Sequence, residues 1–319
     1  MLTAAKSTSS RILVVRLGAM GDIVHALPAA ASLKRSYPGS RLTWVVEPKW
    51  APLLEDNPFI DRLVLLRRDT VAGLRESWRA LRAERYDFAV DFQGLIKSAL
   101  AAFAAHPGRI FGFHRSQLRE RAAALFYSNK TVSGAAHVVD KNLDLAAAAG
   151  ASTLLRTFPL PPGRPEGALP PGDFVLASPL AGWRAKQWPI EHYQALAARL
   201  ERELGIPLVL DGPPGSGLEH CSGLPGLIHA TRRAAAVVGV DSGPLHLAAA
   251  LGKPGVAVYG PTDPARNGPY GDSLQVLRSP AAVTTYKRAA SIDEAMRAVS
   301  PAQVFEALKA MLGERRSLP

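Results

Sequence analysis

The sequence predicts an α/β protein built from two Rossmann-like domains whose parallel sheets face each other across a cleft. In both halves of the chain, short apolar runs alternate with stretches of helical length, which is the pattern of βαβ units. Between the halves lies FPLPPGRPEGALPPGD (158–173), which is too rich in Pro and Gly for a helix or a sheet to persist. The 319 residues suffice for two domains of ordinary size. We expect an N-terminal domain at 1–160 and a C-terminal domain at 161–319.

The N-terminal domain opens on RILVVRL (11–17), a run typical of a buried parallel strand. The helical stretch that follows ends at Pro38, because proline interrupts a helix. Three more strand-like runs and a polar helical stretch come next: RLTWVVEP (41–48), LVLLRR (63–68), the helix at 72–85, and DFAVDFQG (87–94).

The C-terminal domain repeats this alternation. Its strand-like runs and its long helix are FVLASPLAG (174–182), the helix IEHYQALAARLERELG (190–205), IPLVLDG (206–212), AAAVVGVDSG (234–243) and PGVAVYGPTD (254–263). The tail SPAQVFEALKAML (300–312) has a serine cap signal, an early proline and apolar residues at helical spacing, so it predicts a last amphipathic helix. One arrangement that we consider is that this helix packs back on the N-terminal domain.

Composition excludes several classes of protein. A single cysteine, Cys221, rules out a disulfide framework and a cysteine-built zinc site, and it fits a reducing compartment. The eight histidines show no metal-binding spacing, so we expect no metal. The first ten residues lack the apolar core of a signal peptide, and the apolar run ALAAFAA (99–105) is too short to span a bilayer. We therefore expect a cytosolic or peripheral protein.

The net charge of +11 is concentrated in the N-terminal half. Residues 1–160 hold 22 Lys and Arg against 13 Asp and Glu, a net charge of +9, whereas the remainder carries +2. Such an excess favours an anionic partner, which can be a nucleic acid, an anionic membrane surface or an acidic substrate; simple solubility is the alternative reading. No basic helix, zinc-finger spacing or aromatic–basic motif supports nucleic acid.

Asp22 raises the first functional question. In GAMGD (18–22), Gly18 and Gly21 allow a ligand close to the backbone, and the following helix offers unpaired N–H groups. The segment is neither GxGxxG nor a P-loop. Asp22 is therefore either a helix-capping carboxylate, worth about 1 kcal/mol, or a residue that carries chemistry.

Three further loops follow predicted strands. In AGWRAKQWP (181–189), Lys186 beside Gly182 is placed to neutralise a phosphate, or else is a solvated lysine near core tryptophans. VVGVDSGPLHLAAALGKP (237–254) sets a small polar segment at the start of a helix, which suits a diphosphate. The alternatives are that Asp241 is a cap and His246 a core histidine. YGPTDPARNGPYG (259–271) is turn-rich, as binding loops are.

The sequence gives little support to other catalytic mechanisms. For example, the G-x-S-x-G motif of a serine nucleophile elbow does not occur. The polar-rich segments DFQGLIKSA (91–99) and HRSQLRERAAALFY (114–127) belong to the basic half. They offer cations for anion contacts: Lys97, Arg115, Arg119 and Arg121.

Taken in this order, these segments resemble the lipopolysaccharide heptosyltransferases of the inverting glycosyltransferase family 9, most closely the heptosyltransferase I branch. The resemblance covers residues 11–312. The combination VVGVDSGPLHLAAALGKP…VAVYGPTDP…GPYG looks like the donor-site signature of the family. DFQGLIKSA, the arginine-rich segment and HVVDKN (137–142) are similar to that branch. The two-domain layout matches the GT-B fold of the family.

The resemblance implies transfer of heptose from ADP-L-glycero-β-D-manno-heptose to a Kdo residue of lipid A–Kdo, at the cytoplasmic face of the inner membrane, without metal or cofactor. Asp22 matches the catalytic base, which would take the proton from the attacking acceptor hydroxyl. A helix N-terminus lowers a carboxylate pKa and so weakens a base. A weak base suffices if the transition state has oxocarbenium character.

The resemblance also implies which residues bind the substrates. On the donor side, in the C-terminal domain, these are Gly182, Lys186, Asp241, Ser242, Gly243, His246 and Thr262. On the acceptor side, in the N-terminal domain, Arg67 and Arg68 match the positions that meet Kdo carboxylates. The other acceptor-side candidates are Gly18, Gly21, Lys97, Arg119 and His137.

The sequence departs from the family pattern at two places. The family often has threonines where this chain has Ala181 and Gly182. The segment 208–243 is short, and the glutamate expected near the adenosine ribose is out of register; Glu219 is the nearest, and we do not transfer the role to it. Two alternatives follow: a family 9 transferase that uses another nucleotide sugar, or a non-catalytic sugar-nucleotide-binding protein.

Overall fold

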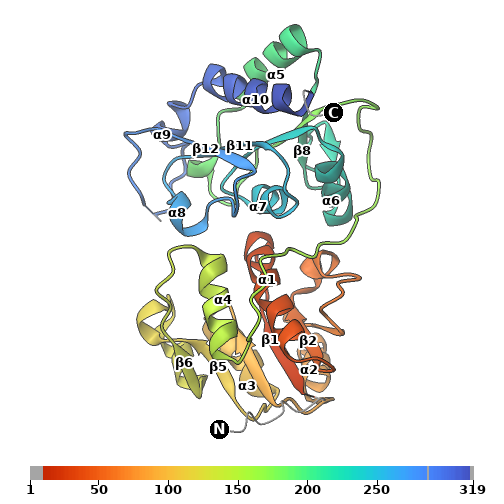
Figure 1. Cartoon of the computed structure of the whole chain (residues 1–319), viewed down its shortest axis with the longest axis vertical. Helices are drawn as coiled ribbons and strands as arrows, with labels where there is room; N and C mark the ends of the chain where they lie inside the picture. The colour runs from red at the N-terminus through yellow and green to blue at the C-terminus, as the bar shows by residue number, and fades with distance from the viewer. Residues whose placement is uncertain (1–9, 286, 317–319) are drawn as a thin grey trace. The chain divides into compact units, whose positions relative to one another are not determined.

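The structure is a computed structural model that describes residues 10–285 and 287–316. Nine of the ten N-terminal residues that lack signal-peptide character lie outside this range. The chain divides between Pro161 and Pro162 into two compact units, each with one six-stranded parallel sheet (Figure 1). None of the helices within the described ranges has the length and apolar character needed to cross a membrane.

The sheet of the first unit has the order β3-β2-β1-β4-β5-β6. Its strands are β1 (Arg11–Val15), β2 (Arg41–Val46), β3 (Arg62–Leu65), β4 (Phe88–Asp91), β5 (Ile110–Phe113) and β6 (Asn129–Thr131). The chain adds strands on one side of β1 and then, from β4, on the other, so the order reverses between β1 and β4. Ligands of such sheets bind beyond the carboxyl ends of the strands at this switch point.

The helices of the first unit form two groups. Helices α1 (Met20–Ser36) and α4 (Val138–Ala148) pack on each other. Helix α2 (Val71–Arg82) adjoins α3 (Ile96–Ala104), which adjoins the 3-10 helix η3 (Arg121–Phe126). The core beneath this second group joins apolar side chains of the strands, such as Leu13 and Val64, to alanines of α3 and η3. Two short 3-10 helices complete the unit: η1 (Pro48–Leu53) and η2 (Arg115–Gln117).

The sheet of the second unit has the order β12-β11-β10-β7-β8-β9, which is the same topology as that of the first. Its strands are β7 (Val175–Ser178), β8 (Leu208–Gly212), β9 (His220–Cys221), β10 (Ala236–Val240), β11 (Gly255–Tyr259) and β12 (Leu274–Arg278). Its helices are η4 (Arg184–Lys186), α5 (Ile190–Leu204), α6 (Leu224–Arg233), α7 (Gly243–Ala250), α8 (Pro264–Asn267), α9 (Glu294–Arg297) and α10 (Pro301–Arg316).

The last helix is an integral part of the second unit. Helix α10 packs on α5 and β11, and its Val304, Phe305 and Leu308 are buried in the core that these elements share. Packing of α10 on the N-terminal domain, the arrangement considered above, stays a prediction.

The linker has the irregular structure that the sequence predicts. Residues 158–173 contain no helix or strand among the described residues, and hydrogen bonds hold its two parts within their own units. The amide of Asn57 donates to the carbonyl of Pro159 at 2.8 Å, and the Glu166 carboxylate accepts from the N–H of Gly223 at 2.7 Å. In the segment 208–243, a two-residue β9 and a ten-residue α6 lie between β8 and β10.

Candidate active site

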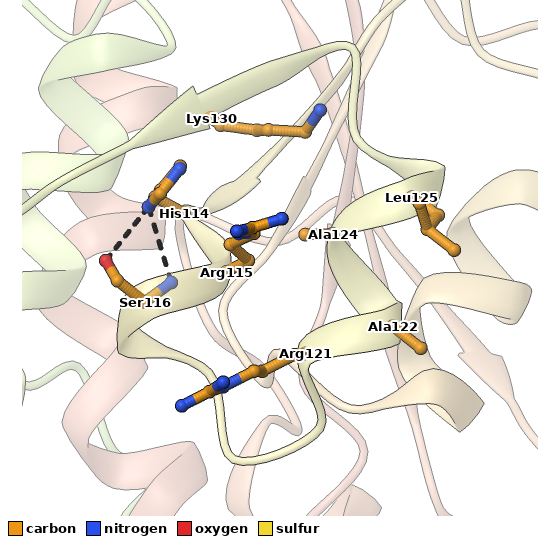
Figure 2. Close-up of a pocket in the computed structure, with 8 residues that line it drawn as sticks. All are labelled: His114, Arg115, Ser116, Arg121, Ala122, Ala124, Leu125 and Lys130. Atoms are coloured by element: carbon orange, nitrogen blue, oxygen red, sulfur yellow. Dashed lines mark hydrogen bonds between the residues drawn. The ribbon is translucent and has the colours of Figure 1, made fainter.

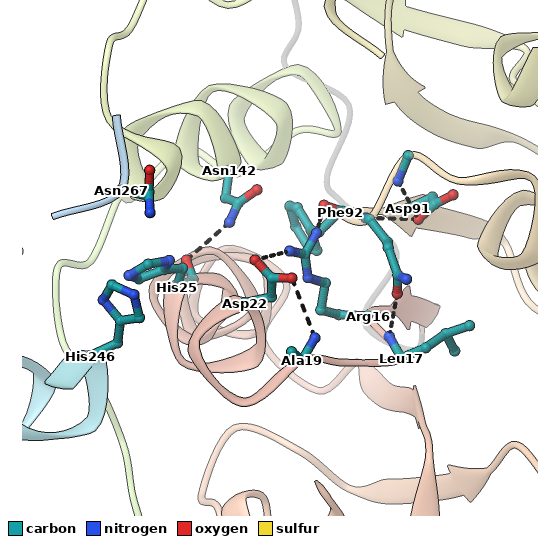
Figure 3. A network of polar contacts seen from close by, with 12 residues as sticks. Arg16, Leu17, Ala19, Asp22, His25, Asp91, Phe92, Asn142, His246 and Asn267 are labelled. Atoms are coloured by element: carbon teal, nitrogen blue, oxygen red, sulfur yellow. Dashed lines mark hydrogen bonds and ion pairs between the residues drawn. The ribbon is translucent and has the colours of Figure 1, made fainter. Parts of the chain in front are cut away.

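Asp22 lies on the first turn of α1, directly after the loop that leaves β1, and its carboxylate is held at both oxygens (Figure 3). Oδ2 accepts from the backbone N–H of Ala19 at 3.3 Å, which is a capping interaction. Oδ1 lies 2.7 Å from Nη2 of Arg16. The side chain is still 47% exposed. Capping and chemistry are therefore compatible, because the cap uses one oxygen and leaves the carboxylate accessible.

Arg16 is a further candidate residue, which the sequence did not indicate. Its side chain is only 7% exposed, and it bridges Asp22 to the turn after β4 by donating from Nη1 to the carbonyl of Phe92. The next residue, Leu17, donates its N–H to Oε1 of Gln93 at 2.7 Å. The two loops at the switch point are thus fastened together. The available signal was a charged residue at the end of the apolar run RILVV, where apolar side chains are the rule.

Asp91 shapes the turn to which Arg16 binds. It is fully buried at the end of β4 and accepts from the N–H groups of Gln93 and Gly94 at 2.9 and 3.2 Å. The hydroxyls of Ser98 and Tyr127 also donate to it, at 2.8 and 2.6 Å. Burial raises the pKa of Asp91, and these hydrogen bonds oppose the rise. Asp91 therefore fixes the turn that presents the Phe92 carbonyl and the Gln93 amide.

The glycines of the first loop are closely packed. A Cβ at Gly18 would lie 2.6 Å from Nε1 of Trp50, so this position needs glycine for its packing. Gly21 is buried within α1. That the two glycines admit an acceptor beside Asp22 stays a prediction.

Two of the predicted acceptor-side cations meet at one carboxylate. Arg68 pairs with Glu47, and Nζ of Lys97 lies 3.4 Å from the same oxygen. Burial alone would raise the pKa of Glu47, but the hydrogen bond from Arg68 and the charge of Lys97 outweigh it and lower the pKa. Glu47 was missed, because only the fold brings it beside residues 21 and 50 positions away.

The other acceptor-side candidates lie outside this cluster. Arg67 is 3.9 Å from Glu76, and Arg119 is highly exposed and 3.6 Å from Glu120. His137 is the N-cap of α4, where its Nδ1 accepts from the N–H of Val139 at 3.1 Å.

A basic pocket of about 860 Å³ lies where η2, η3 and β6 meet (Figure 2). His114, Arg115, Arg121 and Lys130 line it together with apolar residues that include Leu125. Figure 2 shows the cationic side chains on one side of this hollow and Leu125 on the other. An anionic group of substantial size would find complementary charge there.

The second unit carries a separate polar cluster centred on Asp241, at the end of β10. Its Oδ2 lies 2.7 Å from Nζ of Lys186, and its Oδ1 lies 3.4 Å from Nε2 of His246 and accepts from the Asn267 amide at 3.1 Å. Burial would raise the pKa of Asp241, but the hydrogen bond with His246 and the charge of Lys186 outweigh it and hold the pKa well below its usual range. Asp241 is thus a buried anion with cationic and polar partners.

The contacts in this cluster decide between the interpretations of Asp241, Lys186 and His246 that the sequence left open. The N-cap of α7 is Ser242, so Asp241 is not a helix cap. Lys186 is mostly buried, paired with Asp241 and 4.8 Å above the ring of Trp183, so it is not a solvated lysine. His246 is buried but directed at Asp241.

Two hydroxyls that follow strands β10 and β11 have no partner among the described residues. Ser242 Oγ and Thr262 Oγ1 are buried and form no hydrogen bond to any described residue, and Ser242 does not use its side chain to cap α7. Buried hydroxyls are usually satisfied, so both have capacity for a ligand. Gly182 borders open space, since a Cβ built there meets nothing within 4 Å.

Comparison with known proteins decides the family. The model of glycosyltransferase family 9 (heptosyltransferase) matches residues 74–295. The chain belongs to glycosyltransferase family 9. Lipopolysaccharide heptosyltransferase 1 of Escherichia coli K12 is 31% identical over 313 residues, covering 85% of this chain and 94% of the relative. The enzyme of the same name from Pseudomonas aeruginosa is 31% identical over 303 residues, covering 84% of each chain.

Solved structures agree with this assignment. E. coli heptosyltransferase WaaC with ADP superposes with a TM-score of 0.77 at 26% identity, over 94% of this chain and 99% of WaaC. WaaC with ADP-2-deoxy-2-fluoro heptose gives a TM-score of 0.75. The predicted resemblance to family 9 and the α/β fold of GT-B type are therefore confirmed. Within the described residues, no group of three or more His, Cys, Asp or Glu side chains is arranged to hold a metal ion.

Proposed function

We propose that this protein transfers heptose from ADP-L-glycero-β-D-manno-heptose to a Kdo residue of lipid A–Kdo, with inversion at the anomeric carbon, in the synthesis of the lipopolysaccharide inner core. Membership of a heptosyltransferase family and relatives named lipopolysaccharide heptosyltransferase 1 support the reaction. The observation that carries the mechanism is Asp22: an accessible carboxylate, oriented by Arg16, at the switch point of the first sheet.

In this mechanism Asp22 is the general base. The acceptor hydroxyl attacks the anomeric carbon of the heptose and passes its proton to the Asp22 carboxylate, while the bond from that carbon to ADP breaks and ADP leaves with the electron pair. Arg16 holds the Asp22 carboxylate in place through the 2.7 Å ion pair. A carboxylate suffices as the base when the bond to ADP is largely broken before the proton moves.

The donor is assigned to the Asp241 cluster of the second unit. Lys186 and the N-terminus of α7 at Ser242 and Gly243 would stabilise the charge that develops on the departing diphosphate. Asp241 stays ionised and orients Lys186. The ammonium group of Lys186 would then donate hydrogen bonds to phosphate oxygens. Thr262 and Ser242 would donate to the donor from hydroxyls that have no hydrogen-bond partner among the described residues. The proposal invokes no metal or cofactor.

The acceptor is assigned to the first unit, where Arg67, Arg68, Lys97, Arg119 and His137 are the candidate contacts. Arg68 and Lys97 are already neighbours across Glu47, so a Kdo carboxylate would compete with Glu47 for both cations. We place the protein in the cytoplasm, peripheral to the inner membrane, because the proposed acceptor is a membrane lipid.

Two features of the second unit favour a second candidate function. The shortened segment 208–243 and the position of Glu219, which accepts from the backbone N–H of Leu210 at 3.4 Å, favour a family 9 transferase with a different nucleotide sugar. A non-catalytic sugar-nucleotide-binding protein is the further alternative.

Release of ADP tests these readings. We expect release when ADP-heptose and lipid A–Kdo are both present and not when either is omitted. A panel of ADP- and UDP-sugars with the same acceptor separates the two enzymatic readings. Tight binding of ADP-heptose without release on any acceptor would overturn the enzymatic proposal.

A further inference from the structure

The layer formed by α2, α3 and η3 carries apolar side chains on its outer surface. Twelve large hydrophobic residues are exposed in the part of the chain that the structure describes, and seven belong to this layer. They are Val71, Leu74, Trp78, Ile96, Leu100, Phe103 and Leu125. We call these seven residues the apolar outer layer. Their concentration on three neighbouring elements is unlike the scattered exposure of single apolar residues on ordinary surfaces.

Helix α2 carries large apolar side chains on its outer face. Its inward residues are Gly73, Ser77 and Leu81, and Ser77 is engaged by hydrogen bonds to the backbone, including 2.8 Å to the Gly73 carbonyl. Its outward residues Leu74 and Trp78 are about half exposed. A surface helix normally turns its apolar stripe to the core. The outer stripe of α2 is therefore not explained by the packing of the unit.

Helix α3 repeats this arrangement. Its buried residues are small, mostly alanine, whereas Ile96, Leu100 and Phe103 are exposed on the first, second and third turns. The Phe103 ring lies 5.6 Å from that of Phe126, which joins α3 to η3. On η3, Leu125 is 84% exposed. Because α2 adjoins α3 and α3 adjoins η3, the exposed residues lie on adjacent elements of one layer (Figure 1).

The part of the chain that forms the apolar outer layer is rich in positive charge. Residues 67–130 contain 12 Lys and Arg against 6 Asp and Glu, a net charge of +6 out of +11 for the chain. On α2 itself Arg75, Arg79 and Arg82 are exposed, and the Arg82 guanidinium lies 5.2 Å from the Trp78 ring centroid. At η3, Leu125 borders the basic pocket of Figure 2.

We propose that the apolar outer layer is a docking surface for an anionic lipid bilayer. Aromatic and aliphatic side chains among arginines are the composition that binds a membrane interface: the apolar groups enter the headgroup region while the cations meet lipid phosphates. A second copy of the chain fits less well, because a two-fold interface would bring two strongly positive surfaces together. This inference rests on the proposed function in one respect, since a lipid acceptor gives the docking a purpose.

The position of the layer relative to the site supports this purpose. Helix α2 follows the carboxyl end of β3, and α3 follows that of β4, so both helices start at the edge of the sheet that holds Asp22 and its supporting turn. Val71 and Ile96, the first residues of the two helices, are exposed there next to Arg68 and Lys97. A docked bilayer would deliver a lipid acceptor to this edge.

Sedimentation of the full-length protein with vesicles tests the docking surface. We expect binding to phosphatidylcholine vesicles that contain phosphatidylglycerol, weakening as salt is added, and little binding to pure phosphatidylcholine. Replacing Leu74, Trp78, Phe103 and Leu125 by Gln should weaken binding by about tenfold or more. The control is Val283→Gln, an exposed apolar residue of the second unit, and this variant should bind as the native protein does.

The charge contribution needs its own variant. Arg75→Gln with Arg79→Gln should reduce binding to the anionic vesicles and flatten its salt dependence, whereas Arg202→Gln on α5, a similarly exposed arginine, should not. Equal binding of native protein and apolar variant would overturn the proposal. So would equal binding to neutral vesicles, or self-association of the native protein that the apolar variant abolishes.

These results are separable from the proposed reaction, because the vesicles contain neither donor nor acceptor. With a deacylated, water-soluble acceptor, the apolar variant should release ADP as fast as the native protein, and it should be slower only on the acceptor embedded in vesicles. If the proposed reaction is wrong, no acceptor yields ADP, yet vesicle binding is still measured. Equal rates on both acceptors would contradict the docking role.

Discussion

The two units have the same sheet topology, and each places an aspartate at its strand ends, but the two carboxylates differ in their surroundings. Asp22 is half exposed and is held by one buried arginine and one N–H group. Asp241 is buried and held by Lys186, His246 and Asn267, with its pKa well below the usual range. The difference teaches that the surroundings fit the two carboxylates for different proposed roles. Asp22 is accessible to an acceptor hydroxyl, whereas the buried Asp241 is positioned to orient Lys186.

The largest expected effect is on turnover when the accessible carboxylate is removed. Asp22→Asn keeps the size of the side chain and the capping oxygen but has no basic carboxylate, so turnover should fall by about a thousandfold, within the range for a general base. Asp140→Asn is a matched control, because Asp140 is also the third residue of its helix and lies 3.4 Å from Arg156. ADP release measures both. Loss of activity in Asp140→Asn alone would reverse the assignment.

The next effect concerns the buried anion and its cation. Lys186→Gln removes the charge that Asp241 orients, and the interaction at stake is a charge-assisted hydrogen bond of about 1.5–3 kcal/mol. We expect kcat/KM for the donor to fall by about ten- to a hundredfold, measured by varying ADP-heptose at fixed acceptor. Lys309→Gln on α10 should change nothing. Unchanged donor kinetics in Lys186→Gln would show that Lys186 takes no part in donor binding.

A smaller effect is expected at the support of Asp22. Arg16→Lys keeps the charge but cannot bridge both Asp22 and the Phe92 carbonyl with one planar group. Turnover should fall by about tenfold while KM for the donor stays unchanged, which steady-state kinetics resolves. The alternative is that Arg16 serves only the fold. In that case turnover would fall together with thermal stability, and refolding at low temperature would change neither.

The smallest effect is expected at a hydroxyl. Thr262→Val keeps the shape and removes a buried hydroxyl without a protein partner in the described chain. ADP affinity should fall by about fivefold, the value of one hydrogen bond, while the melting temperature holds or rises. Calorimetric titration and thermal unfolding provide the two readouts. Lower stability with unchanged affinity would mean that the hydroxyl serves the fold.

The fold and the residues of the Asp241 cluster were largely predictable because their signals are local. Apolar runs, proline and glycine mark strands, the linker and loops, and Asp241, Ser242 and His246 occur within one short segment. The support of Asp22 was not predictable, since Arg16 and Phe92 are 76 residues apart and meet only when β1 and β4 pair. The outward apolar face of α2 was equally hidden, because periodicity does not reveal that Gly73 and Ser77 occupy the core side.

The proposed roles are that Asp22 acts as the base and that Asp241 supports donor binding. The most direct test is to measure ADP affinity and turnover together for Asp22→Asn and Asp241→Asn. We predict that Asp22→Asn binds ADP within about twofold of the native protein, yet has lost turnover, whereas Asp241→Asn binds ADP at least about tenfold more weakly. Full turnover in a folded Asp22→Asn variant, or a loss of ADP affinity that matches that of Asp241→Asn, would contradict the account.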